Sequence, residues 1–159
     1  MKGLLWRSDG PFLLESGEIL PELTVYYQTF GELNREKNNV IWVTHALTGN
    51  ADASDWWAGL VGPGKCFDPE KYFIVCANNL GSCYGSSGPL DVNPLTGSPY
   101  YSDFPLITIK DQVQAHKALA KALDVHQIFI GIGGSMGGQQ MVQWAVDEPN
   151  RFIHLVLLA

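Results

Sequence analysis

The 159-residue sequence has no long hydrophobic run and few charged residues. No apolar stretch approaches the roughly 20 residues that span a bilayer. The start, MKGLLWRSDGPF, places charges where a secretory signal needs an apolar segment. Charged residues make up 16% of the chain and hydrophobic residues 46%, which excludes a disordered composition. We therefore expect a soluble, globular, cytoplasmic protein that does not bind a membrane.

Cysteines and clusters of basic residues are also scarce. Cys66, Cys76 and Cys83 lack the spacing of metal ligands, and an odd number makes a poor disulfide framework. We expect free thiols and no metal. The 10 Lys and Arg residues are outnumbered by 16 Asp and Glu residues, and the net charge of −6 argues against nucleic-acid binding. Small molecules or proteins remain as partners.

The order of predicted elements indicates an α/β fold with a mostly parallel sheet. No repeat or linker divides the chain, so we expect residues 1–159 to belong to one domain. Runs of β-branched and aromatic residues predict strands at 22–30, 40–46, 71–80, 127–132 and 152–159. Apolar periodicity predicts helices at 108–125 and 137–148. Thr108 and Asp111 resemble a capping box, and residues 81–105 predict a surface excursion.

A serine lies among glycines in the stretch IGIGGSMGGQQM, between a predicted buried strand and a helix. Gly133 to Gly137 match G-x-S-x-G, the motif that holds a serine on a sharp strand-to-helix turn. Such a turn strains the serine and brings backbones close together, which requires the glycines. We predict that Ser135 is a nucleophile and that the Met136 N–H is an oxyanion donor. The second donor should come from the loop after the strand at 40–46.

Other interpretations of these glycines fit less well. A glycine-rich strand-to-helix turn that serves only close packing is the better interpretation of an isolated G-x-S-x-G, but the position of this motif between a buried strand and a helix favours the catalytic one. A dinucleotide-binding G-x-G-x-x-G would begin at Gly131, but Met136 occupies its third glycine position. The stretch GSCYG would make Cys83 the nucleophile, but prolines interrupt the helix that should follow. We interpret His45, at the end of a predicted strand, as bonded to backbone rather than catalytic.

Three segments are similar to the homoserine O-acetyltransferase family: HALTG, NNLGSCYGSSGP and GGSMGGQQMVQWAVDEPNRF. The resemblance covers nearly the whole chain. It implies the α/β-hydrolase fold and transfer of an acetyl group from acetyl-CoA to the γ-hydroxyl of L-homoserine in methionine biosynthesis, with no bound cofactor. It also implies Ser135 as the nucleophile and the amides of Leu47 and Met136 as oxyanion donors. Many members of the family carry Met where this chain has Gln139.

The residues after Ser135 do not supply the rest of a catalytic triad. In the fold that the resemblance implies, the chain order is serine, acid, histidine. The histidines lie before the serine or directly after its helix, at His45, His116, His126 and His154. Asp147 is also too close to serve as the acid. We therefore expect residues 1–159 to be the N-terminal part of one α/β-hydrolase domain with about six strands, without the lid, the acid and the histidine.

Three functions remain open. The first is a serine acyltransferase that works by a ping-pong mechanism, with either acetyl or succinyl as the group transferred. The second is an esterase, which passes the acyl group from the same serine to water. The third is a non-catalytic fragment that a second chain completes. The apolar stretch HLVLLA predicts an exposed edge strand, and hence a homodimer or a complementing C-terminal chain.

Overall fold

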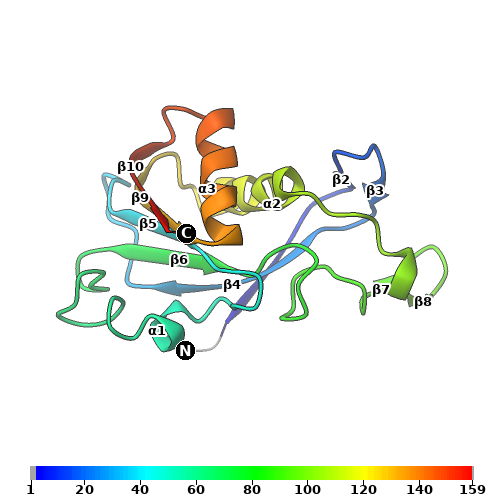
Figure 1. Cartoon of the computed structure of the whole chain (residues 1–159), viewed down its shortest axis with the longest axis horizontal. Helices are drawn as coiled ribbons and strands as arrows, with labels where there is room; N and C mark the ends of the chain where they lie inside the picture. Colours follow the sequence, from blue (N-terminus) through cyan, green and yellow to red (C-terminus); the bar gives the residue numbers. More distant parts are fainter. Residues whose placement is uncertain (1–2, 159) are drawn as a thin grey trace.

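A six-stranded sheet forms the centre of the protein, whose computed structural model describes residues 3–158 (Figure 1). In spatial order its strands are β1 (Leu4–Arg7), β4 (Thr24–Phe30), β6 (Phe73–Ala77), β5 (Val40–Thr44), β9 (Ile128–Gly134) and β10 (Phe152–Leu158). The four strands from β6 to β10 are parallel. Strand β4 is antiparallel to β6, and β1 is antiparallel to β4. The predicted α/β fold with a mostly parallel sheet is confirmed.

The two central strands are apolar along their whole length because both faces of the sheet are covered. Every residue of β5 is buried, as are four of the five residues of β6. Successive side chains point to opposite faces. Trp42 therefore packs in the core on one side of the sheet, whereas Ile41 and Val43 pack in the core on the other. Continuous apolar runs of this kind are typical of buried parallel strands.

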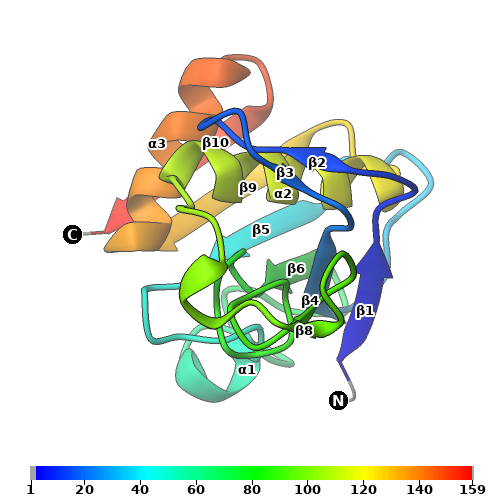
Figure 2. The same ribbon diagram turned by 90° about the vertical axis from the view of Figure 1, so that its right-hand side faces the viewer.

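Helices lie on both faces of the sheet (Figure 2). The longer helices, α2 (Ile109–Ala122) and α3 (Met136–Asp147), lie side by side on one face. Leu119 of α2 and Trp144 of α3 pack there against Trp42. The short helix α1 (Ala53–Trp56) contributes Ala53 to the core on the opposite face. The architecture is thus a three-layer sandwich, which leaves the ends of the parallel strands open along one edge.

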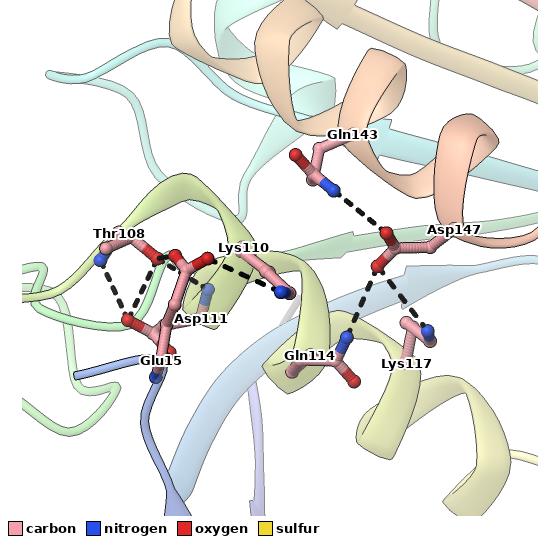
Figure 3. Close-up of polar contacts among 8 residues, drawn as sticks. All are labelled: Glu15, Thr108, Lys110, Asp111, Gln114, Lys117, Gln143 and Asp147. Atoms are coloured by element: carbon pink, nitrogen blue, oxygen red, sulfur yellow. Dashed lines mark hydrogen bonds and ion pairs between the residues drawn. The ribbon is translucent and has the colours of Figure 1, made fainter. Parts of the chain in front are cut away.

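Helix α2 begins with the capping box that the sequence predicts (Figure 3). The N–H of Asp111 donates to the Thr108 hydroxyl, and the Asp111 carboxylate accepts from the Thr108 N–H at 2.9 Å. The other oxygen of the same carboxylate accepts from the N–H of Glu15 at 2.7 Å. The helix start is therefore also the anchor for the N-terminal part of the chain.

Several short elements were not predicted. They are the strand β1 at the edge of the central sheet, the hairpin of β2 (Phe12–Leu13) and β3 (Ile19–Leu20), the helix α1, the hairpin of β7 (Val92–Asn93) and β8 (Ser98–Pro99), and the 3₁₀ turn η1 (Tyr101–Asp103). Strands of two residues are too short to show an alternating pattern. The predicted strands at 40–46 and 71–80 are shorter in the structure, because the chain leaves the sheet at Thr44 and Ala77. Ala159 of the last predicted strand lies outside the described residues.

No helix within residues 3–158 is long and apolar enough to cross a membrane.

The last strand, β10, lies at one end of the sheet beside β9. Its exposed side chains include Ile153 and Leu157, each 50% exposed. This edge agrees with the edge strand predicted from the apolar sequence HLVLLA.

The buried His116 should make stability depend on pH. Its ring packs against both Trp42 and Trp144, which also contact each other, and it is 2% exposed. Burial, with a smaller effect from His45, lowers its pKa from 6.5 to about 4 against the opposing hydrogen bond to Gln140. Between these two pH values the unfolded chain binds a proton that the folded chain does not. The contribution of neutral His116 to the free energy of unfolding is therefore fully present above pH 6.5. It is lost as pH falls toward 4, and the total loss is on the order of 3 kcal/mol.

We expect His116→Gln to flatten this part of the pH dependence. Urea unfolding of the full-length protein at several pH values between 7 and 4.5 measures it as the change in the free energy of unfolding. His126→Gln is the matched control, because His126 is exposed, with 75% of its side chain accessible, and pairs with Asp124. Equal pH slopes in His116→Gln and the unaltered protein would show that His116 does not titrate with a lowered pKa.

Candidate active site

Ser135 occupies a sharp turn between the end of β9 and the start of α3. Its backbone angles are φ 53° and ψ −122°. A residue with a side chain rarely adopts such a conformation, which costs on the order of 1–3 kcal/mol and persists only where surrounding contacts impose it. The side chain is exposed, and within the described chain it makes no capping hydrogen bond to the helix. The side chain is therefore accessible from solvent.

The glycines on either side of the serine are required by close backbone approach. A Cβ atom on Gly133 would lie 2.3 Å from the Thr44 hydroxyl oxygen and 2.4 Å from the backbone of Gly137. A Cβ atom on Gly137 would lie 2.2 Å from the backbone oxygen of Thr44. The Thr44 hydroxyl also donates to the Gly137 carbonyl at 2.8 Å. The serine turn thus packs directly against the end of β5.

The loop after β5 lies beside the serine turn. Thr44 pairs in register with Gly133, so the two strands end at the same edge of the sheet. A Cβ atom on Gly137 would also lie 3.0 Å from the backbone oxygen of His45. The structure therefore brings the loop that carries Leu47 to the first turn of α3, which carries Met136. The side chain of Leu47 is 72% exposed.

Helix α3 gives this edge a positive electrostatic character. The amides of its first turn have no partner within the helix, and the helix dipole adds about half a positive charge there. Residues 136–139 are Met, Gly, Gly and Gln, so no carboxylate of that turn neutralises it. A negative charge that develops beside Ser135 would be stabilised.

A groove of about 730 Å³ adjoins Ser135. Its walls come mostly from the apolar side chains of α3 and β10, namely Val142, Val146, Leu157 and Leu158. Gln139 also lines it, so the position that differs from many family members lies next to the serine. Cys83 is exposed and lines a separate pocket formed by residues 81–91. Cys83 is not among the residues that line the groove beside Ser135.

The four histidines do not form a base for Ser135 within residues 3–158, where no hydrogen bond joins a histidine to this serine. His45 and His116 are buried. His126 bonds to Asp124 at 2.8 Å, and the His154 ring contacts Phe129 with 5.3 Å between ring centres. His45 bonds to the carbonyl of Ala46, as its interpretation as a strand-end residue predicts.

Asp147, the acid nearest the serine in the later sequence, ties the two large helices together (Figure 3). It accepts from Gln143 at 2.8 Å and from Gln114 at 3.3 Å, and it lies 3.7 Å from the Lys117 amine. These contacts explain its position without a catalytic role. In the described part of the chain, no group of three or more His, Cys, Asp or Glu residues could hold a metal ion.

Sequence reasoning missed the polar residues beneath the site. Thr44, Asn79 and Gln140 are all buried and hydrogen-bonded at the edge where the serine turn lies. They lie at the end of β5, in the loop after β6 and in α3, which are far apart in the sequence. Polar residues at the ends of predicted strands, as in VTHA and CANN, were the only available signal.

Comparisons with known proteins agree with this geometry. Residues 39–159 match the family described as alpha/beta hydrolase fold. The chain is 52% identical to the homoserine O-acetyltransferase of Chlorobium chlorochromatii over 92% of this chain and 41% of the relative. It is 45% identical to the homoserine O-acetyltransferase of Caulobacter vibrioides over 99% of this chain and 44% of the relative. The chain thus spans less than half the length of these curated relatives.

Solved structures give the same result. The homoserine O-acetyltransferase of Bacillus anthracis aligns with a TM-score of 0.90 and 31% identity, over 97% of this chain and 45% of that one. Esterase E22 aligns with a TM-score of 0.85 and 30% identity, over 95% of this chain and 45% of that one.

Proposed function

We propose, since this chain belongs to the α/β hydrolase fold family, that Ser135 is the nucleophile of an acyltransferase that moves an acetyl group from acetyl-CoA to the γ-hydroxyl of L-homoserine. The observation that carries the proposal is the strained turn at Ser135, held by backbone contacts against the end of β5. Relatives named homoserine O-acetyltransferase support the choice of reaction. The product would serve methionine biosynthesis.

In the first half-reaction, the Ser135 oxygen attacks the thioester carbonyl of acetyl-CoA. The amides of Leu47 and Met136 hold the oxyanion that forms. The carbon–sulfur bond then breaks, and CoA leaves as a thiol with the proton that serine gave up. A histidine carries that proton, and we assign it, with its acid, to a part of the protein that follows these residues in the chain order of the fold.

In the second half-reaction, the γ-hydroxyl of homoserine attacks the acetyl-serine. The same two amides stabilise the second oxyanion, and the histidine takes the proton of the hydroxyl. The bond between the acetyl carbon and the serine oxygen breaks, and the proton returns to Ser135. The products are O-acetylhomoserine and the original enzyme, in a ping-pong sequence.

An esterase is the second candidate, because the fold of esterase E22 matches this chain over almost its whole length. Both reactions share the acyl-serine and the oxyanion donors. They differ only in the group that accepts the acyl chain, which is homoserine in one and water in the other.

The test is mass spectrometry of the full-length protein mixed with acetyl-CoA or succinyl-CoA without an acceptor. We expect an acetyl adduct on the peptide that contains Ser135, discharged quickly by homoserine and slowly by water. A succinyl adduct instead would correct the acyl donor. Equally fast discharge with and without homoserine would favour the esterase, and the absence of any adduct would refute the serine mechanism.

A further inference from the structure

We propose that His45 is a positioning residue, which sets the direction of the Leu47 amide by holding the carbonyl group of the same peptide unit. The proposal rests on the proposed function, since it needs Leu47 to be an oxyanion donor. It adds a role for a buried polar network that links this loop to the helix that carries the other donor.

The contact that carries the proposal joins His45 to the next residue. The Nδ1 atom of His45 lies 2.8 Å from the carbonyl oxygen of Ala46. That carbonyl and the N–H of Leu47 belong to one planar, trans peptide unit and point in opposite directions. Fixing the oxygen therefore fixes the N–H. The Leu47 side chain is exposed, so it does not itself hold this N–H in a fixed direction.

The surroundings of His45 select the tautomer that this contact needs. Its Nε2 atom accepts from the N–H of Asn79 at 3.3 Å, which leaves the proton on Nδ1 to be donated to Ala46. The Asn79 side-chain nitrogen also lies 3.3 Å from Nδ1. When Nδ1 carries the proton, it forms no hydrogen bond with the Asn79 side-chain nitrogen, since both are donors. The tautomer with the proton on Nε2 would gain this hydrogen bond but would lose those to Ala46 and to the Asn79 N–H. Burial lowers the pKa of His45, which keeps the ring neutral.

A network of hydrogen bonds connects His45 to α3 through Asn79. The side-chain oxygen of Asn79 accepts from Gln140 at 3.0 Å. Gln140 gives its second N–H to Gln112 at 2.7 Å, and its oxygen accepts from Nε2 of His116 at 3.2 Å. His45, Asn79 and Gln140 are each at most 3% exposed. Because buried polar networks of this kind resist rearrangement, the loop and the first part of α3 are held in one fixed relation.

Gly49 supports the same contact from the loop side. Its N–H donates to the Ala46 carbonyl at 2.9 Å. A Cβ atom on Gly49 would lie 2.9 Å from the His45 Cβ and 3.2 Å from its Nδ1. A side chain at position 49 would therefore displace the ring that holds the carbonyl. The His45 ring and the Gly49 N–H thus both donate to the Ala46 carbonyl oxygen. A role for His45 confined to ending the strand would not require this second donor.

A pair of substitutions separates the two nitrogen atoms of the ring. In His45→Asn, the amide nitrogen takes the place of Nδ1 and can still donate to Ala46. In His45→Gln, the amide takes the place of Nε2, and the donor to Ala46 is lost. The exposed His126 offers the control His126→Gln. Acetylation of Ser135 is followed in the full-length protein with 4-nitrophenyl acetate, whose ester bond breaks as the acetyl-serine bond forms and 4-nitrophenol leaves with the serine proton.

We expect His45→Gln to lower kcat for acetylation roughly 10- to 100-fold with little change in KM, less than the 10²–10³-fold cost of deleting an oxyanion donor. His45→Asn should recover most of this loss. Gly49→Ala should also lower kcat, which provides a second test if His45→Gln does not fold. His126→Gln should match the unaltered protein.

The outcomes separate this inference from the proposed function. Equal rates in His45→Gln and the unaltered protein would overturn the inference alone. The same holds for a change confined to KM, or for His45→Asn as slow as His45→Gln. If the unaltered protein formed no acetyl-serine, both the inference and the serine mechanism would be refuted. If it reacted with the ester and showed the expected pattern but did not acetylate homoserine, the inference would stand and only the assigned acceptor would fall.

Discussion

We expect Ser135→Ala to lower kcat for acyl transfer in the full-length protein by about 10⁴-fold or more, as in other enzymes with an acyl-serine intermediate. The loss should be this large because one hydroxyl forms the covalent intermediate of both half-reactions. The measurement is steady-state formation of O-acetylhomoserine, together with the loss of the acetyl adduct. Near-normal activity would end the assignment of Ser135 as the nucleophile.

Two further substitutions give controls. Cys83→Ala should keep most of the activity, since Cys83 lines a separate pocket. Ser135→Gly should be as inactive as Ser135→Ala but more stable, by about 1 kcal/mol, because glycine adopts a φ of 53° without strain. If Ser135→Gly were the less stable of the two in urea unfolding, the turn would not be strained. An inactive Cys83→Ala beside an active Ser135→Ala would move the nucleophile to Cys83.

Of the glycine-to-alanine substitutions at the site, Gly137→Ala should destabilise the fold most. The new Cβ would lie 2.2 Å from the backbone oxygen of Thr44, so the helix or the strand must move. We expect a loss of about 3 kcal/mol or more in the free energy of unfolding, at the upper end for overpacking. Acyl transfer should fall with it, because the displaced helix carries the Met136 amide.

The neighbouring glycine provides the matched control. A Cβ atom on Gly134 would meet only the Cβ of Leu158, at 3.8 Å, which is an ordinary contact. Gly134→Ala should therefore change the free energy of unfolding by less than about 0.5 kcal/mol. Urea unfolding of both variants makes the comparison. Equal stabilities would mean that contact with β5 does not explain the glycine at 137.

The serine turn could be predicted from the sequence because its requirements are local. A strained serine between a strand and a helix requires glycine two positions to either side, and these glycines are visible as Gly133 and Gly137. The start of α2 was predictable for the same reason, since Thr108 and Asp111 are three residues apart. Such patterns depend on chemistry within a few residues of chain.

The order of the strands and the polar network could not be predicted this way. Strand β6 lies between β4 and β5, although it follows both in the sequence. Asn79 and Gln140 meet across 61 residues of sequence, and neither carries a local motif. Contacts of this kind depend on how distant segments pack, which the residues on either side do not specify.

The contact between Thr44 and Gly137 joins positions 93 residues apart. Closing so long a loop is entropically costly, so such contacts form late compared with the turns inside a helix. Until β5 and β9 pair, nothing forces Ser135 into its unfavourable backbone angles, and the unfolded serine is an ordinary one. In the proposed mechanism Ser135 therefore becomes reactive only after β5 and β9 have paired. The acetyl-serine adduct would then also report that β5 and β9 have paired.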